Sequence, residues 1–132
     1  MTLFVDTSAL YALMDGDDTN HESARRFWNQ LDPDELLVTH NYVLVETSAL
    51  VQRRLGVEAL RAFADDLMLP ISTVFVDQAV HTAALSGVLG ARMRQLSLVD
   101  MVSFEVMRRM GVGTAFAFDD HFTRFGFDCQ PD

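Results

Sequence analysis

One stretch decides the fold of this chain: Leu3-Phe4-Val5-Asp6-Thr7-Ser8-Ala9-Leu10. Its first three residues are apolar and β-prone, which predicts a buried strand, and the run Thr7–Met14 predicts a short helix directly after it. Asp6 therefore stands where a strand ends and a helix begins. In an open parallel sheet, ligands bind in the crevice beyond this end of the strands. An Asp here is also a common N-cap, and its position alone leaves both interpretations open.

Short strands and longer helices alternate along the rest of the chain. Further strands are predicted over residues 36–39, 72–76 and 115–118, and helices over residues 20–31, 41–55, 58–69, 78–93 and 98–110. Gly56 and Gly111 follow two of these helices, as is typical of glycine at a helix end. Parallel strands joined by long helices need crossover connections. The sequence therefore predicts an α/β fold, with a central parallel β-sheet of four or five strands flanked by helices on both faces.

Length and composition indicate a single domain over residues 1–132. The chain is 49% hydrophobic and 22% charged, which is typical of a globular domain. Its one cysteine, Cys129, excludes an intramolecular disulfide and fits a reducing compartment. The longest apolar run, Ala9–Met14, has six residues, against about 20 for a membrane span. The N-terminus also lacks the features of a signal peptide. We therefore expect a cytoplasmic protein with no membrane segment.

The charge balance narrows the classes of function. Ten basic residues stand against nineteen acidic ones, giving a formal net charge of −9. A smooth phosphate-binding surface is therefore not expected, because non-specific binding to nucleic acid needs clustered positive charge. All ten basic residues are arginine. The lack of lysine excludes a P-loop and Schiff-base catalysis.

Two more carboxylates besides Asp6 stand where the sequence pattern would predict an apolar or neutral residue. Glu46 has apolar residues three and four positions away on its predicted helix, so we expect it to lie on a buried face. A buried carboxylate is costly unless it is paired or bound to a metal. The alternatives are an ion pair with an arginine, or a helix rotated so that Glu46 reaches solvent. Asp119 repeats the position of Asp6 after a predicted strand, and its neighbour Asp120 leaves open which of the two belongs to a site. Either residue could instead cap the turn that follows.

A third carboxylate, Asp100, lies in the first turn of a predicted helix. Ser97 and Asp100 have the spacing of a capping box, so Asp100 taken alone is better explained by a structural role than by a catalytic one. Asp6, Glu46, Asp100 and Asp119 could nevertheless converge on one crevice, where they would repel one another without a cation. Ligand sets of oxygen alone suit Mg²⁺ or Mn²⁺. Such a site points to a nuclease or a phosphatase, in which two metals about 4 Å apart can activate water.

The histidines give less evidence of a functional site than the carboxylates do. No two of them have the close spacing of a zinc-binding pair. His121 follows Asp119 and Asp120, and we expect it at a solvent-exposed position of a helical turn. Arg92 and Arg94 precede Asp100, at the end of the predicted helix 78–93 and in the loop that follows it, and we expect them to contact substrate phosphates.

These motifs, taken together and in order, resemble the PIN-domain family, and most closely the VapC-type ribonuclease toxins of bacterial toxin–antitoxin pairs. The matching segments are Phe4–Leu10, Val45–Thr47, Ser97–Phe104 and Ala117–Phe127. The resemblance implies that Asp6, Glu46, Asp100 and Asp119 form the acidic catalytic site, with Asp6 and Asp100 as the principal metal ligands. It also implies that Ser8 supports the site, and we group Ser8 with the two arginines as a substrate contact. The chain departs from the family at Asp120, where relatives often have a basic residue.

The function implied by the resemblance is Mg²⁺- or Mn²⁺-dependent endonucleolytic cleavage of RNA. It further implies homodimerisation and inhibition by a small antitoxin protein. The alternative is a PIN-fold module that binds RNA or protein with little or no catalytic activity. A phosphatase of the aspartyl-phosphate type is excluded, because such an enzyme needs a second Asp where Ser8 stands, and also a lysine.

Overall fold

The computed structural model describes residues 1–132 and contains five strands. The strands are β1 Thr2–Val5, β2 Leu36–His40, β3 Ile71–Val74, β4 Thr114–Phe116 and β5 Asp128–Gln130. The helices are α1 Thr7–Met14, α2 His21–Asn29, α3 Asn41–Leu55, α4 Val57–Ala62, α5 Gln78–Ala91, α6 Leu98–Met110 and α7 His121–Arg124, with a π-helical turn, η1, at Phe63–Leu67. None of the helices is both long and apolar enough to cross a bilayer.

All five strands are parallel, in the order β3-β2-β1-β4-β5. This confirms the predicted α/β fold and the central parallel sheet. The strand β5 lies in a segment for which the sequence predicts no strand, because three polar or small residues give no apolar alternation. It forms by pairing with the free edge of β4, where Ala115 lies opposite Cys129.

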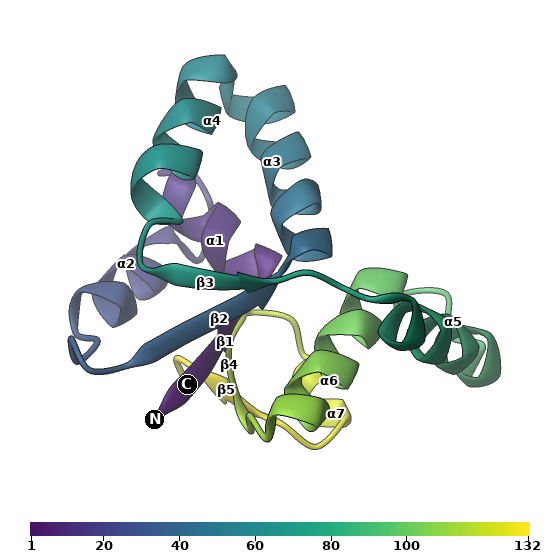
Figure 1. Cartoon of the computed structure of the whole chain (residues 1–132). Helices are drawn as coiled ribbons and strands as arrows, with labels where there is room; N and C mark the ends of the chain where they lie inside the picture. The colour runs from purple at the N-terminus through teal and green to yellow at the C-terminus, as the bar shows by residue number, and fades with distance from the viewer.

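The strand order places the helices. From β1 through β2 to β3 the chain moves in one direction across the sheet, and from β3 it returns to β4 and continues to β5 on the other side of β1. Right-handed crossovers then put α1 to α4 on one face and α5 to α7 on the other, as Figure 1 shows. The direction reverses between β1 and β4. The crevice beyond the carboxyl ends of these two strands is the expected ligand site of an open parallel sheet.

Phenylalanine side chains attach α6 and α7 to the sheet. Phe104 of α6 is fully buried, and its ring lies 5.1 Å from that of Phe122 in a T-shaped arrangement. It also stacks on Phe125 at 4.7 Å and on Phe127 at 5.6 Å. Phe122 in turn packs against Phe4 of β1 at 6.0 Å. The start of α7 is therefore fixed beside the carboxyl end of β1.

A buried histidine joins β2, α3 and α6. His40 is the last residue of β2 and caps α3, because its Nδ1 accepts hydrogen bonds from the backbone N–H groups of Tyr42 and Val43 at 3.2 and 3.3 Å. Its Nε2 lies 2.8 Å from the hydroxyl of Ser103, which donates to the carbonyl of Val99. Burial lowers the pKa of His40 to about 4, so the ring is neutral near pH 7. It ties the start of α3 to the start of α6.

The aromatic contacts give a test of the core. Phe104→Ala is expected to lower the free energy of unfolding by about 3–5 kcal/mol, because it leaves a cavity that its neighbours fill only in part. Phe75→Ala is the matched control, since that side chain is 74% exposed, and it should change stability by less than about 0.5 kcal/mol. Urea unfolding measures both variants. Equal losses in the two would contradict this description of the core.

Candidate metal centre

Three side chains converge beyond the carboxyl ends of β1 and β4. The ligand atoms of Asp100, Asp119 and His121 all lie within 4.8 Å of one another. Asp6 directly follows β1 and stands outside this group of three, but the negative charges of both Asp100 and Asp119 act on its carboxyl group. We call these four residues the switch-point cluster, because they gather where the strand order reverses.

Asp6 is both a helix cap and a member of the cluster. Its Oδ2 accepts hydrogen bonds from the backbone N–H and the hydroxyl of Ser8, at 3.1 and 2.7 Å, which caps α1. Its other oxygen makes no hydrogen bond to the protein. Burial raises the pKa of Asp6 to about 7, with smaller contributions from the charges of Asp100 and Asp119, while the bonds from Ser8 oppose the rise. The two interpretations of Asp6 are therefore compatible.

Ser8 positions Asp6 and has little capacity left for substrate. Its hydroxyl donates to Asp6 Oδ2 at 2.7 Å and accepts from the backbone N–H of Phe118 at 2.9 Å. The hydroxyl thus links the start of α1 to the segment that follows β4. We correct the expected substrate contact to a positioning role, because the one proton of the hydroxyl is already used.

Asp100, like Asp6, is both a helix cap and a member of the cluster. The capping box is complete: Asp100 Oδ2 accepts from the backbone N–H of Ser97 at 3.2 Å, and Ser97 Oγ accepts from the N–H of Asp100 at 3.0 Å. Its Oδ1 makes no hydrogen bond. Burial is the largest cause that raises the pKa of Asp100 to about 6, and the charge of Asp119 raises it further. Desolvation thus raises the pKa of Asp100 more than the repulsion between carboxylates does, although repulsion is the cause that the sequence suggests.

The position expected for His121 is wrong. The residue is buried rather than exposed, and its Nδ1 lies 2.9 Å from Asp119 Oδ1 and 3.6 Å from Asp100 Oδ2. The backbone N–H of His121 also donates to Asp119 Oδ1 at 2.9 Å. This local turn directs the imidazole toward the cluster, and the buried Phe122 holds the turn in place. The signal for this position in the sequence is a His that stands two residues after an Asp and directly before an aromatic residue.

The choice between Asp119 and Asp120 can now be made on geometry. Asp119 lies in the cluster, whereas the exposed Asp120 pairs with Arg124 at 3.1 Å along α7. An ion pair with this exposure contributes little to stability. The acid that departs from the family pattern therefore points away from the cluster.

Glu46 does not lie on a buried face. It is half-buried on α3, and Ala49, one turn further along, is exposed. The open alternative, a helix rotated so that Glu46 reaches solvent, describes the structure, and no arginine pairs with it. Glu46 borders a hollow of about 400 Å³ that Tyr42 and Val99 also line. Since Val99 lies in the first turn of α6, the hollow lies beside the start of that helix.

The two candidate substrate arginines lie in the connection between α5 and α6. Arg92 ends α5 in the left-handed conformation, with φ of 55°, and Arg94 follows two residues later. Both are exposed, and neither has a carboxylate within ion-pair distance. They border a shallow hollow of about 520 Å³ with apolar side chains. Their guanidinium groups are free to contact an anionic ligand.

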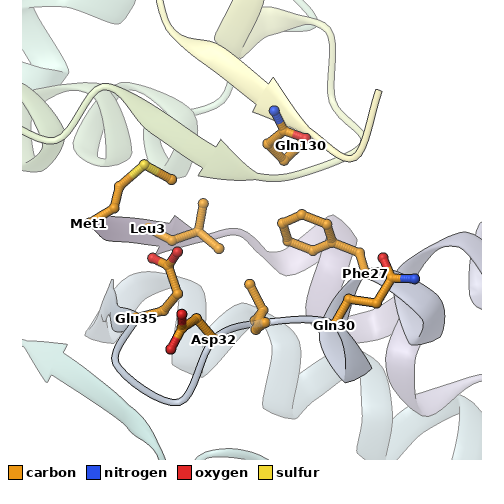
Figure 2. A pocket seen from close by; sticks show the side chains of 8 residues that line it. Met1, Leu3, Phe27, Gln30, Asp32, Glu35 and Gln130 are labelled. Carbon is orange, nitrogen blue, oxygen red and sulfur yellow. The ribbon is translucent and has the colours of Figure 1, made fainter.

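A separate hollow lies near the amino end of β1, whereas the cluster lies beyond the carboxyl end of that strand. Figure 2 shows it between Leu3 and Phe27, with the carboxylates of Asp32 and Glu35 on one side. Its volume is about 300 Å³. No group of three metal-ligating side chains gathers there. We therefore place the candidate site at the switch-point cluster.

The cluster fits a divalent cation. Asp6 and Asp100 each have an oxygen that makes no hydrogen bond, and His121 Nδ1 is buried without a hydrogen-bond partner. Two buried carboxylates with raised pKa values are costly to ionise, and a bound cation would offset that cost. Perturbed carboxyl groups in a crevice are also typical of catalytic sites.

Comparison with known proteins agrees with the geometry. The PIN domain profile matches residues 3–128. The chain is 36% identical over 126 residues to the 23S rRNA-specific endonuclease VapC20 of Mycobacterium tuberculosis, in two strains, and the match covers 95% of each protein. The crystal structure of Mycobacterium tuberculosis VapC20, described as a sarcin–ricin loop cleaving toxin, superposes with a TM-score of 0.86 over 95% of both chains.

Two more distant structures share the fold alone. VapBC2 from Rickettsia felis, bound to a promoter DNA fragment, has a TM-score of 0.74 at 10% identity over 98% of both chains. VapBC-1 from nontypeable Haemophilus influenzae has a TM-score of 0.68 at 15% identity, over 98% of this chain and 97% of the other. The profile match over nearly the whole chain and the identity to VapC20 confirm the resemblance seen in the motifs. This chain belongs to the PIN-domain family.

Proposed function

We propose that this protein is a metal-dependent endoribonuclease that acts as the toxin of a toxin–antitoxin pair and cleaves a structured loop of 23S rRNA. The observation that carries the proposal is the convergence of Asp6, Asp100 and Asp119 at the reversal of strand order. The identity of 36% to an rRNA-specific endonuclease over 95% of both chains supports the substrate class.

Asp6, Asp100 and Asp119 would hold Mg²⁺ or Mn²⁺, and we keep Glu46 as the fourth carboxylate of the proposed site. The chemistry that a bound divalent cation supplies is the activation of water and the stabilisation of charge on the phosphodiester oxygens. The protein contributes a prepared site. Ser8 and Ser97 fix one oxygen of Asp6 and of Asp100 respectively, and leave the other oxygen free.

The raised pKa values define a second role for the same carboxyl groups. With pKa values of about 7 and about 6 in the metal-free protein, Asp6 and Asp100 can hold or release a proton near neutral pH. Ions bind to the deprotonated carboxylates, so binding is coupled to proton release. Occupancy of the site should therefore rise with pH over this range.

Substrate binding by this acidic chain must depend on shape and on a few contacts. With a net charge of −9, the surface does not attract RNA in general. Arg92 and Arg94 are exposed and free of carboxylate partners, and we assign them to phosphate contacts with the substrate. Sequence-specific recognition of RNA mostly targets unpaired loops and bulges, which agrees with a loop substrate.

The proposal also includes two protein partners and a place of action. A toxin needs an inhibitor in the cell that makes it, and the negatively charged cluster favours a basic segment of a small antitoxin protein. We further expect a homodimer that acts in the cytoplasm. Leu69, Phe75 and Leu89 are 82%, 74% and 68% exposed, so apolar surface is available to a partner.

The adjacent aspartates give the sharpest test of activity. Asp119→Asn is expected to reduce cleavage of an RNA carrying the 23S sarcin–ricin loop by at least about 100-fold, the upper end of what the loss of an outer-shell partner costs. Asp120→Asn is the matched control and should keep most of the activity, because it breaks only an exposed ion pair. Cleavage is measured with Mg²⁺ or Mn²⁺ and with EDTA. Undiminished cleavage in EDTA, or equal loss in both variants, would contradict the proposal and favour a binding module.

A second prediction concerns stability and pH without metal. Because the folded-state pKa values of Asp6 and Asp100 are raised, the unfolded chain releases these protons first as pH rises. The free energy of unfolding should therefore fall between about pH 4 and pH 7. Asp6→Asn keeps a side-chain oxygen for the cap and should show a shallower fall. Thermal melts in EDTA across this range measure both proteins.

Added metal completes that stability test. At 100 times its Kd, a cation bound only by the folded state stabilises the wild type by about 2.7 kcal/mol, and Asp6→Asn should show a smaller shift. Asp120→Asn should behave like the wild type. A variant Asp6→Asn that is less stable in EDTA at pH 7.5, yet keeps the full metal shift, would show that Asp6 is a helix cap alone.

A further inference from the structure

The imidazole of His121 presents a feature that the folded protein does not explain. Its side chain is 10% exposed, and its Nδ1 is buried without a hydrogen-bond partner. Asp119 Oδ1 lies only 2.9 Å away, but the contact lacks the direction of a hydrogen bond. A buried polar atom without a partner costs about 1–3 kcal/mol. Such an atom in a folded protein calls for an explanation, and an ion that binds there is one.

The ring is held so that this nitrogen faces the carboxylates. The backbone N–H of His121 donates to Asp119 Oδ1 at 2.9 Å, and the next residue, Phe122, is fully buried against Phe104. The other ring nitrogen, Nε2, makes no hydrogen bond to the protein and is not among the buried atoms without a partner, so it has access to water. The fold therefore presents Nδ1 to the cluster and leaves Nε2 to solvent.

We infer that Nδ1 of His121 is a direct ligand of the cation at the switch-point cluster, so that the donor set contains an imidazole nitrogen beside the carboxylates of Asp100 and Asp119. This inference rests on the metal site of the proposed function and changes its ion preference. Imidazole is a favourable donor for transition metals, whereas Mg²⁺ prefers oxygen and keeps several waters. The site should therefore select Mn²⁺ or Co²⁺ over Mg²⁺ more strongly than carboxylates alone would.

The competing explanation is that His121 is a counter-charge that neutralises Asp100 and Asp119 until a cation replaces it. The two roles give opposite results on removal of the ring. If His121 only balances charge, its loss should leave the binding of every divalent ion equal or stronger. If His121 is a ligand, its loss should weaken transition metals selectively, because water readily takes its place on Mg²⁺.

The experiment compares the wild type, His121→Asn and the matched control His21→Asn by calorimetric titration with Mn²⁺ and with Mg²⁺, without RNA. His21 contacts the carbonyl of Ala12 at 2.7 Å, away from the cluster. His121→Asn is expected to lose about 10- to 100-fold in Mn²⁺ affinity, at least the cost of losing an outer-shell partner. Its Mg²⁺ affinity should change by a much smaller factor, and His21→Asn should match the wild type. Equal changes for both ions, or a gain in affinity, would overturn the inference.

A measurement on the wild type keeps the inference testable if His121→Asn fails to fold. Proton NMR of the protein titrated with Co²⁺ should show a strongly shifted, non-exchangeable signal from the carbon-bound ring protons of a histidine bound through Nδ1. The absence of such a signal in Co²⁺-saturated protein would overturn the assignment. Saturation without that signal rejects the ligand role and leaves the nuclease proposal standing. A wild type that binds none of these ions rejects the metal site itself.

Discussion

The burial of two carboxyl groups at the end of one strand and at the start of one helix is the constraint on which this structure depends. Asp6 and Asp100 are 4% and 8% exposed, and burial is the main cause that raises their pKa values to about 7 and about 6. Ionising both near neutral pH opposes folding. A domain whose only requirement was stability would place apolar or neutral residues there. A cation that binds only the folded state reverses the effect, so the cost of the site falls mainly on the metal-free protein.

The fold meets this constraint with hydrogen bonds that also build its helices. The caps of α1 and α6 each use one oxygen of a cluster carboxylate, so the groups that start the helices also orient the site. Ser8 extends this arrangement to the segment after β4, and His40 ties the start of α3 to that of α6 through Ser103. Structural and functional explanations of Asp6 and Asp100 therefore describe the same contacts. Removing either carboxylate alters both a helix terminus and the site.

The sequence predicted the parts of the molecule in which local pattern and tertiary environment agree. The bounds of α3 and α6 follow from apolar periodicity and from the glycines after them, and the parallel sheet follows from alternating strands and helices. The strand β5 could not be predicted, since its pairing with β4 depends on the edge that the rest of the sheet leaves free. At the site, strand-end and helix-start positions made Asp6, Asp100 and Asp119 candidates, and the structure brings the three close together. Helix periodicity misplaced Glu46, because α3 is rotated enough to expose Ala49.

His121 shows most clearly what pattern alone omits. Its side chain points inward because of the turn at Asp119 and the packing of Phe122 against Phe104. Neither feature produces a periodic pattern of residues in the sequence. With His121 included, the cluster contains nitrogen as well as oxygen donors. The most direct test of the central claim, that this cluster holds a divalent cation, is anomalous X-ray diffraction from crystals of the protein grown with Mn²⁺. We predict a manganese peak bounded by the side chains of Asp100, Asp119 and His121. No peak at the cluster, or a peak only at the distant hollow beside Asp32 and Glu35, would contradict the account.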